Sequence, residues 1–505
     1  MSENQALLGP KPKVTSSLVF ATIVVCFGSI QYGYHMAELN APGQVLSCTE
    51  FVEPWPQAGP YADTWFGKHG FQQCLPLTEE QMGLATSVFS IGGLIGSLYA
   101  GRVADRYGRK KYSFTNCIIG IIGSLILFRA NSYAQLIAGR FVAGISCGSC
   151  IVVTPLFINE ISPKELRGSL GSMNQVCINI GILLTQLLAL KYADSYRWRW
   201  LMLAGAVLAL IQFLLLFKID ESPLWLASRG DLDGAEHVLR GLRGGDRRRS
   251  RGEVDEWLQS RGSSRPATSS ADYTQMNSPA SQQSAFPESV SSSSSQQDVS
   301  IKSYFTDPRY SKSRWAVTVI LVSQQFCGIG SIIFYGVKLV SGQLPQYAVL
   351  VNFGISILNV VVTLGASSLV DHWGRKPLLT ASAGAISIAS IFVSTGIVTS
   401  NAAMLVVSVF MYIAVFAIGL GPIPFLVISE LSPPEASGIA QSYGTTCNWL
   451  GTFIVGYGFP ILSERLHGYA FLVFAAYAAM FTLYIHLKVP ETKGKQDYDL
   501  IWNRS

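Results

Sequence analysis

The sequence predicts an all-α membrane protein, with twelve transmembrane helices in two pseudo-symmetric six-helix halves and a small cytosolic helical domain between them. Of the 505 residues, 49% are hydrophobic and only 13% are charged, which is too apolar for an ordinary soluble protein of this length. The chain also repeats itself: Asp105-Arg106-Tyr107-Gly108-Arg109-Lys110 returns as Asp371-His372-Trp373-Gly374-Arg375-Lys376, and Glu160-Ile161-Ser162-Pro163 returns as Glu430-Leu431-Ser432-Pro433. A doubled membrane bundle that keeps charged hairpins at the same place in both halves is typical of a transporter.

The apolar segments set the expected order of domains. A spanning helix needs roughly 20 apolar residues, and such segments cover 17–37, 82–102, 113–130, 133–158, 169–190, 199–217, 314–337, 346–370, 377–398, 402–428, 437–462 and 469–488. The first has no small-residue cleavage site, so it is interpreted as a retained helix and not as a signal peptide. We expect a cytosolic tail (1–15), an N-terminal half (16–218), a cytosolic helical domain (219–312) with a disordered Ser-rich linker (262–299), a C-terminal half (313–489) and a cytosolic tail (490–505).

Basic residues predict the orientation. The loop after the second segment carries five Arg and Lys residues, whereas the loop from Gly43 to Glu80 is acidic, so the basic hairpins and both termini are expected in the cytosol. The net charge of +6 reflects this asymmetry, and nothing in the pattern indicates a nucleic-acid partner. Leu7 and Leu8, in an acidic dileucine pattern, suggest an adaptor-binding signal for endosomes or a vacuole; the plasma membrane is the favoured location and a vacuolar or endosomal membrane the alternative.

Cysteine positions argue against a redox or metal centre. Seven of the nine cysteines lie inside apolar segments, where a thiol usually serves as a small packing group, so we expect no metal and no cofactor. Cys48 and Cys74 lie in the long first exoplasmic loop, where an oxidising compartment permits a disulfide. Whether they pair or stay free is left open by the spacing.

Charges at the cytosolic helix ends suggest a gate, because they are expensive to hold near lipid unless they pair or face water. Ion pairs that form when the transporter faces outward and break when it faces inward would bias a two-state equilibrium. The alternative is static charge that only sets topology. The candidates are Asp105, Arg106, Arg109, Glu160, Arg167, Asp371, Arg375 and Glu430.

Amides inside apolar segments suggest a neutral, polyhydroxylated solute, since amides both donate to and accept from hydroxyl groups. Gln175, Gln186, Gln324, Gln325 and Asn359 all fall in such segments, whereas buried Arg or Lys for an anionic solute is scarce. The alternative role for any one amide is to staple two helices together. Gly419 to Pro424 predicts a helix interrupted at mid-membrane, beside a binding cavity.

Several motifs follow one another along nearly the whole chain: Gly33-Tyr34 with Asn40-Ala41-Pro42, the run Asp105 to Lys110, Gly139-Arg140, the run Pro155 to Gly168, Glu221-Ser222-Pro223, Gln324-Gln325, Gly421-Pro422-Ile423-Pro424, and Pro490 to Gly494. Together they resemble the signatures of the sugar porter family of the major facilitator superfamily, which includes the facilitative glucose (hexose) transporters. The resemblance implies the major facilitator fold and alternating access around a central sugar site.

By position, the resemblance implies sugar contacts at Gln175, Gln324, Gln325, Asn359 and Trp449. Independently of the resemblance, the aromatic Phe425 in a membrane segment is a candidate apolar face for a sugar ring, with packing as the alternative. The resemblance also adds Arg140, Glu221 and Glu491 to the gate charges. The chain departs from the family at Gly330, where a sugar-binding Asn is common, at Ala417, where an acidic residue is common, at Phe425 in place of Trp, and at Ser437 in place of Arg.

Energy coupling depends on the first segment. Proton-coupled members of the family resemble one another in carrying an Asp directly after the Gly-Tyr or Gly-Phe pair. This chain has His35 at that position. Imidazole titrates near neutral pH and Glu38 follows about one helical turn later, so proton coupling through these two residues stays an alternative.

We therefore expect a transporter and not an enzyme. The expected transporter carries a hexose such as glucose by facilitated diffusion. The alternatives are a proton-coupled sugar symporter, a carrier of a polyol, inositol or another neutral solute, and, in a different class, a non-transporting sugar receptor.

Overall fold

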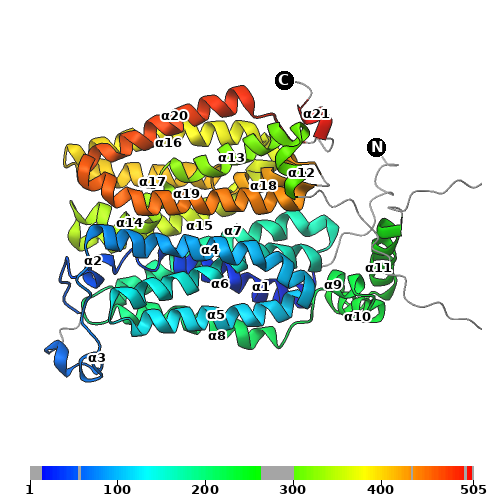
Figure 1. Cartoon of the computed structure of the whole chain (residues 1–505), viewed down its shortest axis with the longest axis horizontal. Coiled ribbons are helices and arrows are strands. Elements are labelled where there is room, and N and C mark those ends of the chain that lie inside the picture. Colours follow the sequence, from blue (N-terminus) through cyan, green and yellow to red (C-terminus); the bar gives the residue numbers. More distant parts are fainter. Residues whose placement is uncertain (1–13, 55–58, 263–300, 434–435, 494–497, 503–505) are drawn as a thin grey trace, which may run out of the picture.

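The structure, a computed structural model, describes residues 14–54, 59–262, 301–433, 436–493 and 498–502. Long helices run side by side in two stacked bundles, one from each half of the chain (Figure 1). Helices α9 to α12 and α21 gather at one end, which the basic hairpins identify as the cytosolic end. Leu7, Leu8 and residues 263–299 of the expected linker lie outside the described residues.

The membrane helices agree closely with the expected segments. The N-terminal half contains α1 (Ser16–Ala37), α4 (Glu79–Tyr107), α5 (Arg109–Arg129), α6 (Tyr133–Ile161), α7 (Arg167–Tyr192) and α8 (Arg199–Leu216). The C-terminal half contains α13 (Ser311–Phe326) with α14 (Ile329–Ser341), α15 (Ala348–Trp373), α16 (Arg375–Val398), α17 (Ala402–Ile418) with α18 (Ile423–Leu431), α19 (Ser437–Leu466) and α20 (Ala470–Lys488).

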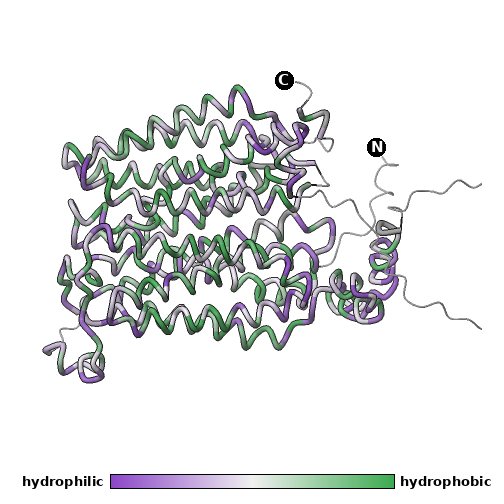
Figure 2. The backbone as a smooth tube through the Cα atoms, viewed as in Figure 1, coloured by the Kyte–Doolittle hydropathy of each residue, from purple (hydrophilic) through white to green (hydrophobic). Residues whose placement is uncertain are grey.

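Twelve spans result from these helices. In the described residues, eleven stretches are long and apolar enough to cross a bilayer. One of them, Ser437–Lys488, contains both α19 and α20, separated by a 3-10 turn at His467–Tyr469, and therefore supplies two spans. Figure 2 shows hydrophobic residues along the bundles and hydrophilic ones concentrated towards their ends and on α10 and α11. The predicted multi-pass, all-helical fold is confirmed.

Small residues allow the helices of the N-terminal half to pack closely. A Cβ on Gly92 or Gly96 would lie 2.1 Å from a backbone oxygen of α6, and one on Gly148 would lie 2.0 Å from the Gly93 oxygen of α4. Only glycine fits at such distances, and this contact of small residues is a usual way to join membrane helices without a hydrophobic driving force. The backbones of α4 and α6 are therefore closely packed.

Two membrane helices are broken. The predicted interruption lies between α17 and α18, at residues 419–422. A second break, between α13 and α14, was not predicted: Gly328 there has φ +100°, in the left-handed region. The break after α17 frees backbone carbonyls, and the Gln324 amide donates to the oxygens of Leu420 (2.7 Å) and Gly421 (3.3 Å). Broken helices are stable in a membrane when side chains satisfy the freed groups in this way.

Hydrogen bonds join the two halves near the exoplasmic end. The Val337 N–H on α14 donates to the Asn40 side chain (3.0 Å), and the Ser341 hydroxyl donates to Gln44 (3.1 Å). Lys338 on α14 forms an ion pair with Glu79 at the start of α4. The exoplasmic ends of α1, α2 (Gly43–Leu46) and α4 are thus tied to α14.

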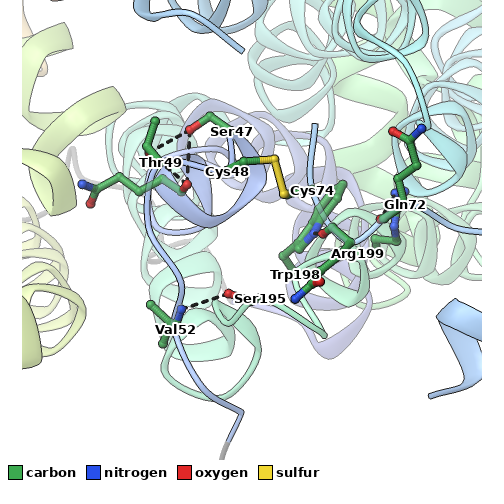
Figure 3. The surroundings of a disulfide bond; sticks show 11 residues. Ser47, Cys48, Thr49, Val52, Gln72, Cys74, Ser195, Trp198 and Arg199 are labelled. Atoms are coloured by element: carbon green, nitrogen blue, oxygen red, sulfur yellow. Dashed lines mark hydrogen bonds between the residues drawn. A yellow bond between two sulfur atoms is a disulfide. The ribbon is translucent and has the colours of Figure 1, made fainter. Parts of the chain in front are cut away.

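The Cys48–Cys74 disulfide lies in the exoplasmic loop (Figure 3), with Cα atoms 5.4 Å apart. The loop is held to the start of α8, where Trp198 donates to the Gln73 carbonyl and Arg199 donates to the Gln72 carbonyl, both at 2.8 Å. The other seven cysteines are buried and free. The structure therefore answers the question that spacing left open, in favour of the bridge.

The cytosolic helices between the halves are α9 (Pro223–Ser228), α10 (Leu232–Leu242) and α11 (Arg247–Gly262). They share a small apolar core of Ala227, Ala235, Leu239 and Val254. Shorter helices complete the described fold: α3 (Trp65–Lys68), α12 (Ile301–Thr306) and α21 (Tyr498–Trp502), with 3-10 turns at Tyr61–Asp63, Lys164–Leu166, Pro308–Tyr310 and Pro345–Tyr347.

Candidate functional site

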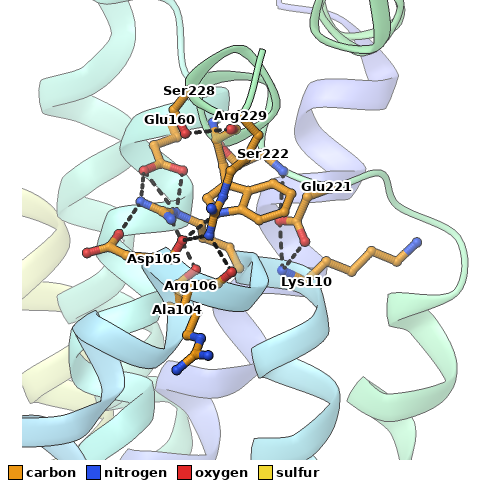
Figure 4. Close-up of polar contacts among 11 residues, drawn as sticks. Ala104, Asp105, Arg106, Lys110, Glu160, Glu221, Ser222, Ser228 and Arg229 are labelled. Atoms are coloured by element: carbon orange, nitrogen blue, oxygen red, sulfur yellow. Dashed lines mark hydrogen bonds and ion pairs between the residues drawn. The ribbon is translucent and has the colours of Figure 1, made fainter. Parts of the chain in front are cut away.

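A buried charge cluster lies at the cytosolic end of the N-terminal half. Arg109, the first residue of α5, pairs with Glu160 on α6 (2.7 Å) and with the more exposed Asp105 (2.8 Å). The Arg109 guanidinium also donates to the Ala104 carbonyl. Figure 4 shows Asp105 and Glu160 on the same side of this cluster, with Glu221 beside Lys110 near the start of α5. Because the charges satisfy one another, they can lie at the membrane boundary.

Glu221 caps the start of α5. Its carboxylate accepts from the Lys110 N–H at 2.9 and 3.1 Å. Gly108, with φ +102°, makes the preceding turn, and a Cβ there would lie 2.3 Å from the Glu221 carboxylate. An anion at a helix N-terminus is favourable because unpaired N–H groups and the helix dipole both point at it.

The C-terminal half repeats this cluster. Arg375, the first residue of α16, pairs with Glu430 on α18 (3.0 Å), and Glu491 accepts from the backbone N–H groups of Arg375 and Lys376 (both 3.1 Å). Gly374, with φ +92°, takes the position of Gly108. The sequence repeat is therefore a repeat of three-dimensional structure.

The ion pairs Arg109–Glu160 and Arg375–Glu430 each join two helices of one half, and the role of these charges as a gate stays a prediction. In the structure's described part, Arg109 and Arg375 each bind the Glu of their own bundle. Arg106 is exposed and lies against the Tyr107 ring. The Nε atom of Arg167 has no hydrogen-bond partner there, and the side chain of Asp371 lies outside the described residues.

Arg140 lies far from this cluster, in a buried charge group on the exoplasmic side of the N-terminal half. Its guanidinium donates to the His35 carbonyl (2.7 Å) and contacts the Glu38 carboxylate (3.5 Å). The His35 ring Nδ1 lies 3.0 Å from the same carboxylate. All three residues are at most 1% exposed, and the second Glu38 oxygen has no hydrogen-bond partner in the described structure. The two candidate coupling residues are thus in contact with each other and with an Arg.

Gln324 is buried for a structural reason. Besides supporting the break after α17, its oxygen accepts from the Asn448 amide on α19 (2.7 Å). Donor and acceptor are both used inside the C-terminal half, so the Gln324 amide acts here as a staple.

Gln325 and Trp449 differ from Gln324, because each holds a polar atom without a partner. The Gln325 Oε1 and the Trp449 Nε1 are buried and make no hydrogen bond within the described chain. The Trp449 ring packs edge-on against Tyr32 (5.8 Å) and Phe89 (6.0 Å) of the other half. A buried polar atom without a partner costs free energy, roughly 1–3 kcal/mol, which a solute hydroxyl would recover.

Asn359 is used across the halves. Its amide and that of Asn179, on α7, form reciprocal hydrogen bonds of 3.3 Å, and Asn179 also donates to the Thr363 hydroxyl (2.8 Å). Sequence reasoning missed Asn179. It follows Gln175 by one helical turn and precedes Gln186 by two, so a search for amides on one helix face would have found it.

The remaining predicted sugar contacts, Gln175 and Phe425, are only half-buried. Gln175 is half-buried on α7 and makes no hydrogen bond to the described residues through its amide. Phe425 is half-buried on α18 and packs against an apolar cluster to which both halves contribute. The structure therefore places predicted site residues on α7, α13, α15, α18 and α19, on both sides of the boundary between the halves.

Two six-helix halves, broken helices and amides at the boundary define a membrane transporter of the major facilitator type. The chain belongs to the family described as sugar (and other) transporter, whose model matches residues 21–500. It is a member of the sugar porter family and not an enzyme.

Relatives span the whole chain. It is 53% identical to a probable metabolite transport protein of Saccharomyces cerevisiae over 97% of this chain and 96% of the relative. It is 45% identical to vacuolar protein sorting-associated protein 73 of the same yeast, over 96% and 95%. It is 30% identical to facilitated glucose transporter member 3 of Mus musculus, over 97% and 93%.

Solved structures share the fold. The xylose transporter XylE from E. coli, in a partially occluded inward-open conformation, superposes with a TM-score of 0.73 at 22% identity, over 96% of this chain and all of that one. At this identity the likeness concerns the fold alone.

Proposed function

We propose that this sugar porter carries a neutral hexose such as glucose down its gradient, by rocking of the two halves about a site that contains Gln325, Trp449 and Asn359. The observation that carries the proposal is a pair of buried atoms, Gln325 Oε1 and Trp449 Nε1, that have no hydrogen-bond partner among the described residues. One accepts and the other donates a hydrogen bond, and hydroxyl groups of a sugar match both.

Chemistry at the boundary favours a neutral solute over an ion. Gln325, Trp449, Asn179 and Asn359 are all uncharged, and Tyr32 and Phe89 supply apolar surface beside the indole. Relatives named as facilitated glucose transporters support a hexose, while the 53% identical yeast relative, named only as a metabolite transporter, leaves a polyol, inositol or another neutral solute as the second substrate class.

Uptake of labelled glucose by proteoliposomes that hold the purified protein tests the proposal. Saturable uptake that stops at equal concentrations and ignores an imposed proton gradient is the expected result. No uptake of glucose by monodisperse protein would overturn the hexose proposal; competition by inositol or a polyol in a binding assay would then identify the second class. Sugar binding without any flux would favour the receptor.

The buried group of His35, Glu38 and Arg140 supports proton coupling as a second candidate. One Glu38 oxygen contacts the His35 imidazole and the Arg140 guanidinium, and the other has no hydrogen-bond partner among the described residues. Accumulation of glucose above equilibrium in an inward proton gradient, lost in Glu38→Gln, would establish the symporter and exclude the uniporter.

The plasma membrane is our proposed location, with a vacuolar or endosomal membrane as the alternative. The name of the 45% identical yeast relative, which refers to vacuolar sorting, supports the alternative. Localisation of a fluorescent fusion, with and without Leu7→Ala and Leu8→Ala, decides between them. Unchanged localisation would remove the proposed adaptor signal.

A further inference from the structure

Asn179 is the polar residue that the proposed function does not yet explain. It lies near the middle of α7, a helix of 26 residues, and meets Asn359 and Thr363 near the middle of α15, also of 26 residues. All three side chains are at most 8% exposed. At about 1.5 Å of rise per residue, the group lies close to half-way across the membrane.

Among the described residues, every hydrogen bond of the Asn179 side chain crosses from one half to the other. Its Nδ2 donates to the Asn359 Oδ1 (3.3 Å) and to the Thr363 hydroxyl (2.8 Å), and its Oδ1 accepts from the Asn359 Nδ2 (3.3 Å). Other polar groups of the N-terminal half, such as Gln31 with Gln212 (2.5 Å), find partners within their own half. A residue that only stabilised the N-terminal bundle would be bonded in the same way as Gln31.

The reciprocal pair keeps two buried amides hydrogen-bonded. Two amides that face each other across the boundary satisfy each other without a solute, so neither pays the cost of an unpartnered buried group. When a solute separates them, they present two carbonyl oxygens and two NH₂ groups, which suit hydroxyls that both donate and accept. On α14, Gly330 offers no side chain, so Asn179 is an amide that the site gains from the opposite half.

We propose that Asn179 is a specificity-determining residue of the solute site: in the empty protein it pairs with Asn359, and on binding both exchange this pair for hydrogen bonds to hydroxyls of the solute. This inference rests on the proposed hexose function. It predicts that Asn179 and Asn359 act as one unit and that they recognise particular hydroxyl groups.

The test is competition and uptake with glucose and its monodeoxy analogues, in wild type, Asn179→Val, Asn359→Val and the double variant. In Asn179→Val we expect kcat/KM for glucose to fall about three- to ten-fold, as for loss of one neutral hydrogen bond. Wild type should discriminate against the analogue that lacks the matching hydroxyl, and Asn179→Val should accept that analogue as well as it accepts glucose. The double variant should resemble the worse single variant.

Ratios between analogues are measured within one variant, so they do not depend on how much protein folds. Asn179→Ser, which keeps a short hydroxyl, should recover part of the discrimination. Asn116→Val, which removes another buried amide of the N-terminal half, bonded there to Cys150, is the matched control and should leave the ratios unchanged.

Wild-type-like discrimination in Asn179→Val, or losses that simply add in the double variant, would overturn the inference while leaving the hexose function intact. Absence of uptake and of binding by wild type for glucose and every analogue would instead overturn the proposed function, and this inference with it.

Discussion

At the scale of single residues, two neighbouring glutamines differ in how their side chains are hydrogen-bonded. Gln324 uses its amide to support the broken helix and to bind Asn448. Gln325 packs its methylenes against Gly451, and its buried oxygen has no partner in the part of the chain that the structure describes. Residue type and position are nearly the same, so only the direction of the side chain separates a structural amide from one that is available to a solute.

Replacement of these glutamines should separate binding from stability. Gln325→Ala removes no hydrogen bond of the described protein, so we expect unchanged thermal stability and a half-saturating glucose concentration about three- to ten-fold higher, as one neutral hydrogen bond is lost on binding. Gln324→Ala should instead lower the unfolding temperature, because the carbonyls of Leu420 and Gly421 lose their donor. Uptake kinetics and thermal unfolding in detergent measure the two effects. An unfolding temperature that fell equally in both variants would contradict the division of roles.

At the scale of elements, the structure repeats a device in each half: a glycine with positive φ, an Arg at the first position of the next helix, and a Glu that caps that helix. Gly108, Arg109 and Glu221 form one copy, and Gly374, Arg375 and Glu491 the other. Glu221 and Glu491 come from the segments that follow the last helix of each half, so each caps a helix well before it in the chain. Glu221 and Glu491 therefore link the chain segment after the last helix of each half to a helix in the middle of that half's sequence.

The break between α13 and α14 depends on one glycine. Gly328 has φ +100°, and a Cβ there would lie 2.6 Å from the Phe474 ring. An L-residue in the left-handed region costs about 1–2 kcal/mol before any clash, so Gly328→Ala should lower the unfolding temperature measurably. Gly342→Ala, at the end of α14 with no atom within 4 Å of the new Cβ, is the control and should have little effect. Equal stability of the two variants would show that α13 and α14 can join without this glycine.

At the scale of the whole molecule, the halves are tied together at the exoplasmic end and at mid-membrane, while the strong cytosolic ion pairs stay within each half. Asn40, Glu79 and Asn179 supply the ties from the N-terminal half. An alternating-access cycle requires that such ties break when the exoplasmic side opens. On the alternating-access mechanism proposed above, the described structure corresponds to a state with its exoplasmic side closed.

Charge reversal at the Glu79–Lys338 pair should shift this state. Both side chains are over a third exposed, at 38% and 43%, so the pair contributes little, on the order of 1 kcal/mol or less. Lys338→Glu places two carboxylates together and should raise the exoplasmic-open population a few-fold. The double variant Glu79→Lys, Lys338→Glu should restore the original balance. Distances between spin labels on the exoplasmic ends of α4 and α14 measure the populations; no change in the single variant would exclude the pair from gating.

The exoplasmic disulfide should contribute to stability without touching the solute site. Cys48 and Cys74 are 26 residues apart and close a loop that docks on α8. Such bridges typically contribute about 2–4 kcal/mol by restricting the unfolded chain, so Cys48→Ser with Cys74→Ser should unfold at a lower temperature while keeping the same half-saturating glucose concentration. Reductant should lower the unfolding temperature of wild type and leave that of the double variant unchanged. If neither the double variant nor reduced wild type unfolded at a lower temperature, docking on α8 alone would hold the loop.

The sequence by itself was enough for the class of protein, the twelve spans and the break at Gly419 to Pro422. These features follow from local properties of the sequence. The length of an apolar segment determines whether it spans the bilayer, the distribution of Arg and Lys sets the orientation, and glycine or proline interrupts a helix. The family followed from motifs spread along the chain.

Partners across the bundle were beyond sequence reasoning. Which of two adjacent glutamines is free, that Arg140 binds Glu38 and not the cytosolic cluster, that Cys48 and Cys74 pair, and that Asn179 meets Asn359 all depend on which helix faces are brought together. Local pattern says that a residue is polar and buried. Only the packing of helices far apart in the chain determines whether a buried polar group has found a protein partner or is left for a solute.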